Sequence, residues 1–241
     1  MLQQYSSKIF SNLNDFDASK ACLDKEKDKI SILGKVILRH KLEDYVGLSL
    51  LHKHFEISHD EKLVEQVKGN QSFATPIRRS EKKDAIPYMW KAHVQPISSE
   101  EDCVFYPLEF LDYSSAGVSE SVVQNTDFMM DIFQALLNMG LSDLFGVSLL
   151  HRSYITLAEN ETILETSNDK HRRLNFGAIS RNSLLEMQDT TQTLWSFKLA
   201  SDGLCGGHSC SGHTDCSGHC IHCSNHCGNH CGDHSPYDGE S

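Results

Sequence analysis

The sequence predicts a mixed α+β body followed by a disordered C-terminal tail rich in cysteine and histidine. Three observations support this prediction. Apolar residues recur at helical spacing in two places, short apolar runs of strand length follow each of them, and large apolar residues nearly vanish beyond residue 201. The 241 residues therefore divide into a body of roughly 200 residues, which is long enough to bury a core, and a tail of roughly 40.

The body contains an internal repeat. Residues 42–52 read LEDYVGLSLLH and residues 141–151 read LSDLFGVSLLH, with seven of eleven positions identical at a constant offset of 99. With small insertions the match continues through Glu61/Glu161, Glu65/Glu165, Ile77/Ile179, Arg79/Arg181 and Trp90/Trp195. We therefore expect an internally duplicated body of two pseudo-repeats, each a helix followed by short antiparallel strands.

Each predicted repeat begins with a helix. The helical spacing is formed by Ile30, Leu33, Ile37 and Leu38 in the first repeat and by Phe128, Ile132, Phe133, Leu136 and Leu137 in the second. A strand-like run then starts at residue 46 or 145. Further strands are expected at 62–67, 73–77, 86–94 and 103–111, and at 162–167, 176–180 and 193–199. The predicted units are 1–113 (first repeat with an N-terminal helical extension), 114–127 (linker), 128–200 (second repeat) and 201–241 (tail).

His52 and His151 occupy matched positions in the two repeats. If residues 46–54 form a strand, Leu48, Leu50, His52 and His54 share one face of it. The two histidines are then candidates for ligands or acid–base groups in a pocket between the halves. The simpler interpretation, which we favour, is that they are hydrogen-bonded histidines at the same structural position in each repeat. We expect the matched glutamates at 61 and 65 to be solvated or to form caps.

The tail is built from Cys-x-x-His units separated by small polar residues. The predicted metal ligands are Cys205, His208, Cys210, His213, Cys216, His219, Cys220, His222, Cys223, His226, Cys227, His230, Cys231 and His234. Gly and Asn between them tolerate the tight turns that bring two ligands to one ion. Ile221 is the only large apolar residue in this stretch. The tail therefore lacks the small core of a zinc finger, and we expect metal coordination to order it.

The ligand types restrict the choice of metal. Thiolate and imidazole together suit Zn²⁺ or Cu⁺, and Ni²⁺ to a lesser degree, whereas Ca²⁺ and Mg²⁺ prefer oxygen. Fourteen ligands could complete about three tetrahedral sites with two groups left over. In composition the segment resembles the His- and Cys-rich tails of metal chaperones and metallothioneins. A low-complexity expansion without a selected role is the alternative interpretation.

Charge and apolar runs exclude several classes of partner. The formal net charge is -11, and about -5 of it lies beyond Lys198, so nucleic acid is not an expected partner. The sequence has no apolar run long enough for a membrane span and no secretory signal pattern, so we expect a cytoplasmic protein that binds no membrane. Clustered cysteines in that compartment indicate metal binding more than disulfides.

Three functional hypotheses remain open. The first is a metal-handling protein that stores, buffers or delivers Zn, Cu or Ni through the tail, with a protein partner for metal transfer. The second is an enzyme whose active site lies near His52 and His151. The third is an interaction module that docks a metal-dependent partner. No nucleophile motif, phosphate-binding glycine loop or HExxH helix accompanies the two histidines, so the first hypothesis is preferred.

Overall fold

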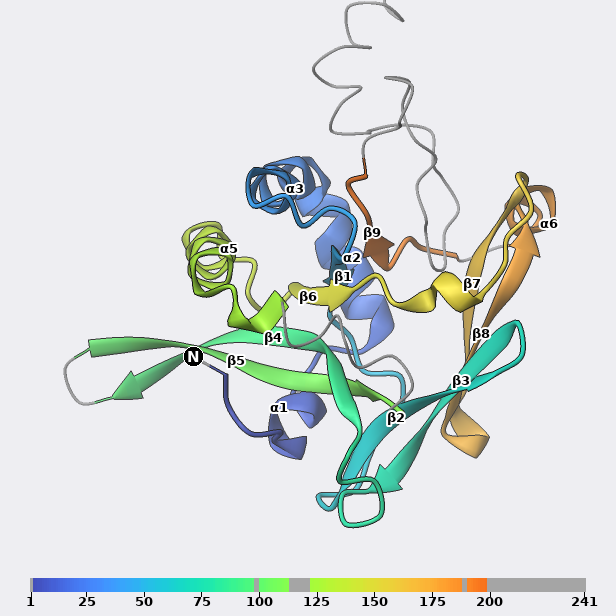
Figure 1. The fold of residues 1–241 in the computed structure, drawn as a ribbon, viewed down its shortest axis with the longest axis horizontal. Coiled ribbons are helices and arrows are strands. Elements are labelled where there is room, and N and C mark those ends of the chain that lie inside the picture. The colour runs from blue at the N-terminus through green and yellow to red at the C-terminus, as the bar shows by residue number, and fades with distance from the viewer. Residues whose placement is uncertain (1, 98–99, 113–121, 188–189, 199–241) are drawn as a thin grey trace, which may run out of the picture.

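The computed structural model describes residues 2–97, 100–112, 122–187 and 190–198 (Figure 1). Three helices precede the first strand: α1 (Ser7–Ser11), α2 (Phe16–Glu26) and α3 (Ile30–Arg39). The strands β1 (Val46–Leu50), β2 (Glu61–Lys68), β3 (Gln71–Arg78), β4 (Ile86–Ile97) and β5 (Glu100–Leu111) follow. After α5 (Thr126–Asn138) come β6 (Phe145–Leu149), β7 (Glu161–Asn168), β8 (Arg173–Ser180), α6 (Arg181–Leu185) and β9 (Leu194–Trp195). The mixed α+β class is confirmed.

All nine of these strands belong to one curled sheet in the order β7-β8-β3-β2-β5-β4-β6-β1-β9. Neighbouring strands are antiparallel except β2 and β5, which are parallel. In the β1–β6 pair, Leu48 lies opposite Val147, a residue 99 positions further along the chain. In the β3–β8 pair, Phe73 lies opposite Asn175. The two strands that open the sequence repeat, β1 and β6, thus pair with each other near the β9 edge of the sheet.

Three apolar clusters lie in the described part of the body, of which two are large. In the first, α3 and α5 pack over β1, β4 and β6, with Leu33, Ile37, Ile132, Phe133 and Trp90 buried between them. The second cluster gathers side chains of α1, β2, β3, β5, β7 and β8 and of the loops that follow β1 and β6. The regular spacing of apolar residues on α3 and α5 explains why each helix buries one face.

Gly47 and Gly146 are matched glycines that the strand packing requires. A Cβ at Gly47 would lie 2.4 Å from the carbonyl oxygen of Trp195, and a Cβ at Gly146 would lie 2.6 Å from that of Trp90. Each glycine therefore lets a neighbouring strand approach β1 or β6 closely. Trp195 pairs with Leu48 on β1, and Trp90 pairs with Val147 on β6.

The predicted helices at 30–38 and 128–137 are confirmed, as are most of the predicted strands. The expected strand over residues 46–54 is wrong beyond Leu50. There the chain bends away, and the backbone N–H of Lys53 bonds the carbonyl of Asn14 at 2.8 Å. Leu51, Phe55 and Ile57 remain buried, but in the second cluster, which explains why the apolar pattern continues after the strand ends. The strand expected at 193–199 shortens to Leu194–Trp195.

None of the described helices is long and apolar enough to cross a membrane.

Candidate functional site

An open cleft of about 480 Å³ lies between β7 and the loop that follows β1. His52, Lys53 and His54 line one side, and Leu164 to Ser167 of β7 line the other. The start of α2 closes one end, where Asp15 caps the helix by accepting from the N–H of Ala18. Thr190, Thr191 and Thr193, on the segment that leads into β9, complete the wall.

The cleft lies beside β7, one edge of the described sheet. β5 pairs with β2 on one side and with β4 on the other. The sequence repeat matches β2 with β7 and β4 with β9. β7 and β9 are instead the two edges of the described sheet, and the structure describes no strand between them. Side chains of the edge strand β7 are therefore accessible from the cleft.

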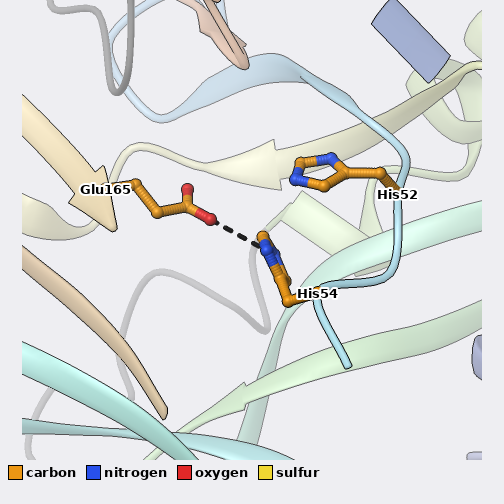
Figure 2. Close-up of side chains that lie close together, drawn as sticks. All are labelled: His52, His54 and Glu165. Atoms are coloured by element: carbon orange, nitrogen blue, oxygen red, sulfur yellow. Dashed lines mark ion pairs between the residues drawn. The ribbon is translucent and has the colours of Figure 1, made fainter. Parts of the chain in front are cut away.

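Three potential metal ligands converge at the base of this cleft. Their ligand atoms, from His52, His54 and Glu165, all lie within 4.8 Å of one another. The Nε2 atom of His54 is 3.2 Å from Oε1 of Glu165, and the His52 and His54 rings lie with their centroids 4.3 Å apart (Figure 2). The side chains of His54 and Glu165 are 9% and 15% exposed. The group is therefore largely shielded from water while facing an open cleft.

The loop that carries the histidines is fixed by backbone contacts. The Ser19 hydroxyl of α2 donates to the carbonyl of Leu51 at 2.7 Å, which fixes the chain just before His52. His52 Nδ1 lies 2.9 Å from the carbonyl oxygen of Leu50, so Nδ1 carries the hydrogen and donates it. This tautomer leaves the Nε2 lone pair of His52 free, which is the form that binds a metal ion.

Burial disfavours the charged form of each of the three side chains. Desolvation lowers the pKa of His52 to about 4 and holds the pKa of His54 well below its usual range, with neighbouring His52 and Arg152 adding to the effect on His54. Desolvation also raises the pKa of Glu165 to about 8, against the opposing charge of Arg152. Burial therefore favours neutral imidazoles, the form that binds a metal ion, and opposes ionisation of the Glu165 carboxyl.

A second buried carboxylate, Glu65 on β2, occupies the position that the sequence repeat matches with Glu165. Its side chain is fully buried, and Arg152 donates to both of its oxygens, Nε to Oε1 at 3.1 Å and Nη2 to Oε2 at 2.9 Å. His151 Nε2 lies 3.1 Å from Oε2, and the hydroxyls of Tyr154 and Ser72 also donate to the carboxylate. Burial alone would raise the pKa of Glu65, but Arg152 and His151 hold it well below its usual range.

The structure places the two predicted body histidines in different surroundings. His52 lines the cleft, whereas His151 contacts Glu65 and Tyr88. The Nδ1 atom of each lies near the carbonyl two residues earlier, at 2.9 Å for His52 and 3.2 Å for His151, which fits the simpler interpretation of a shared structural role. A joint role of His52 and His151 in one pocket stays a prediction. The predicted ligands Cys205 to His234 lie outside the described residues.

The interpretation of the matched glutamates is wrong for one pair. Glu61 and Glu161 do behave as caps, accepting from the backbone N–H of Ser58 and Ala158. Glu65 and Glu165 are instead buried inside the curled sheet. His54 and Glu165 are not among the site residues predicted from the sequence. The His-x-His spacing at 52–54, with a matched glutamate in the other half, is the signal that could have found them.

Comparison with known protein families, curated proteins and solved structures finds no match to this chain.

Proposed function

We propose that this protein binds d-block metal ions and stores, buffers or delivers them, with Zn²⁺ or Cu⁺ as the first candidates and Ni²⁺ as the next. The observation that carries the proposal is the alternation of seven cysteines and seven histidines between Cys205 and His234. Thiolate sulfur and imidazole nitrogen are the ligands that these ions prefer. Delivery would take place in the cytoplasm and would involve a protein partner that accepts the ion.

The composition of the tail supports exchange of ions rather than permanent storage in one rigid site. The stretch has no lysine or arginine, so no built-in cation competes with the metal. Fourteen ligands exceed the twelve that three tetrahedral ions need by about two, and spare ligands let an ion move between sites. Metal binding of this kind couples to ordering of the segment, because the apolar residues needed for an independent core are missing.

The body supports the proposal in a second way, because it provides nitrogen and oxygen ligands of its own at His52, His54 and Glu165. We also propose that the body arose by duplication of one unit. The β1–β6 pair is centred on the matched residues Leu48 and Val147, and Trp90 and Trp195 pair with β6 and β1 in the same relation. This arrangement corresponds to a pseudo-two-fold axis between the halves.

Metal analysis of freshly purified, reduced protein tests the proposal. The comparison is between the full chain and a full-length variant in which the tail cysteines are serine and the tail histidines glutamine. We expect several equivalents of Zn²⁺ or Cu⁺ on the full chain and at most one on the variant. Equal metal content in the two proteins would contradict the proposal.

An enzyme is the second candidate, and one observation favours it. His52 lines an open cleft of about 480 Å³, a volume typical of small-molecule sites. A ligand set of two histidines and one glutamate with a free coordination position is also typical of catalytic zinc sites. The interaction-module hypothesis gains no specific support from the described residues.

A further inference from the structure

The two matched glutamates, Glu65 and Glu165, differ in burial and in partners: the Glu65 side chain is fully buried, and that of Glu165 is 15% exposed. Glu65 has an arginine, a histidine and two hydroxyls around it. The partner that the structure gives Glu165 is His54. Among the residues that the structure describes, no lysine or arginine forms an ion pair with Glu165.

Three of the four side-chain partners of Glu65 are replaced at the matched position in the other half, and the fourth, His151, matches His52. By the offset of 99, Arg152 matches Lys53 and Tyr154 matches Phe55, which has no hydroxyl. By the offset of 102 that relates Ile77 to Ile179, Ser72 matches Leu174, which is apolar and buried. The Glu165 carboxyl therefore loses both hydroxyl donors.

Lys53 does not replace the arginine, because its ammonium group pairs with the exposed carboxylate of Glu56, three residues along the same loop. Among the described residues no lysine or arginine is therefore ion-paired with Glu165, and the charge of Arg152 acts on it without direct contact. A second histidine, His54, stands in this half where the first site has Ser153.

We propose that His52, His54 and Glu165 form a metal site in the body, and that a divalent d-block cation, Zn²⁺ first, takes the place beside Glu165 that the Arg152 guanidinium takes beside Glu65. A buried carboxylate is stabilised by a cation, and either a guanidinium or a metal ion supplies one. The proposal concerns ligands in the folded body and stands independently of metal binding by the tail.

The distances fit this assignment. Two ligands of a tetrahedral Zn²⁺ at about 2.1 Å lie ~3.4 Å apart, and His54 Nε2 and Glu165 Oε1 are 3.2 Å apart. No separation within the group exceeds 4.8 Å, so a small side-chain rotation of His52 closes the set. Its Nδ1 is held by the carbonyl of Leu50, which is the outer contact that orients metal-bound histidines.

The chemistry of the ligands and the cleft defines the kind of site. Two imidazoles and a carboxylate favour Zn²⁺ over Cu⁺, which prefers thiolates. Three protein ligands leave a fourth position, and the open cleft provides the space for a water molecule or an exchangeable ligand there. The site is therefore of the open type, in contrast to closed structural zinc sites with four protein ligands.

Cobalt titration of a full-length chain tests the site. The starting protein carries serine and glutamine at the fourteen tail positions, so that Co²⁺ bound by the body is seen alone. We expect one equivalent of Co²⁺ with the visible d–d bands of a nitrogen- and oxygen-ligated ion and without thiolate charge-transfer bands. Zn²⁺ should displace it stoichiometrically.

Three variants are made in that background: two that each remove a proposed ligand and one control. Glu165→Gln and His54→Gln should each raise the Kd for Co²⁺ by about 100-fold, the upper end of the loss known for outer contacts of metal ligands. His171→Gln, on an exposed histidine, should leave the Kd unchanged. Urea midpoints measured without metal show that each variant folds.

Two results would overturn the proposal: less than one equivalent of Co²⁺ on the folded starting protein, or an unchanged Kd in both Glu165→Gln and His54→Gln. Neither result bears on the tail, whose failure would appear as equal metal content in the wild-type and tail-substituted chains.

Discussion

Glu65 and Glu165 are two carboxyl groups inside the β-sheet whose surroundings differ. At Glu65 the chain supplies its own cation, Arg152, together with hydroxyl donors, and the carboxylate is ionised and fully satisfied. Glu165 has no ion-paired lysine or arginine among the described residues, burial raises the pKa of its carboxyl to about 8, and a cleft lies alongside. This difference is the basis for proposing that the first position serves stability and the second binds a metal ion.

The largest expected effect comes from removing the cation at the first site. Arg152→Ala leaves the ionised Glu65 buried without its partner, and we expect the free energy of unfolding to fall by about 3–5 kcal/mol. The matched change in the other half, Lys53→Ala, removes a contact to an exposed glutamate and should cost less than about 1 kcal/mol. Urea denaturation of both variants measures the difference. A similar loss of unfolding free energy in Arg152→Ala and Lys53→Ala would contradict the difference described between Glu65 and Glu165.

The second prediction concerns Glu109, a buried carboxyl group that, unlike Glu65, has no hydrogen bond from an arginine among the described residues. Tyr88 donates to Glu109, yet burial raises the pKa of Glu109 from 4.5 to about 7. The folded state therefore holds this proton more tightly than the unfolded chain does. The resulting stability is present below pH 4.5 and is lost as the pH rises through 7, a loss of roughly 3 kcal/mol.

Glu109→Gln removes that titration. We expect its free energy of unfolding to decline less between pH 5 and pH 8 than that of the wild-type chain, by an amount on the order of 3 kcal/mol. Glu65, whose pKa is lowered, has the opposite sign: its contribution is present above the unfolded pKa and is lost on acidification below it. Parallel wild-type and Glu109→Gln curves over this range would exclude the role given to Glu109.

The smallest of the three effects concerns the matched glycines. Gly146→Ala forces a Cβ to within 2.6 Å of the Trp90 carbonyl oxygen on the long strand β4, and we expect a loss of about 1–3 kcal/mol. Gly47→Ala meets the carbonyl of Trp195 on the two-residue edge strand β9, which can shift, so its cost should be lower.

Gly177→Ala is the control for the glycine variants, because the nearest atom to its Cβ would be 3.6 Å away, an ordinary contact. Thermal unfolding of the three variants ranks their stabilities, and we expect Gly146→Ala to be the least stable and Gly177→Ala the most stable. A Gly146→Ala protein as stable as Gly177→Ala would show that β4 and β6 are not packed as closely as described.

Much of the fold could be predicted from the sequence because its signals are local. The apolar spacing of α3 and α5 and the apolar runs of the strands reflect one buried face each. Strand ends were harder, since Leu51 and Phe55 stay buried after the chain leaves β1 for the second cluster. The two-residue length of β9 depends on its pairing with β1, which no local pattern encodes.

The candidate site could be predicted only in part. The repeat identified His52 and the matched glutamates, but burial of Glu165 depends on the curl of a sheet assembled from distant strands. The difference between Lys53 and Arg152 reads as a conservative change in sequence. In the structure Arg152 reaches inward to Glu65, while Lys53 pairs with Glu56 on the surface. The partners of the Arg152 and Lys53 side chains, and not their residue types, therefore decide which of the two glutamates forms an ion pair.

The most direct test of the contrast between the two glutamates is anomalous X-ray diffraction at the zinc edge from crystals of the full chain grown with Zn²⁺. We expect an anomalous peak bounded by His52 Nε2, His54 Nε2 and the Glu165 carboxylate, with none beside Glu65, where Arg152 occupies the position. Ordered side chains at His52, His54 and Glu165 without a peak, or an equal peak at Glu65, would contradict it.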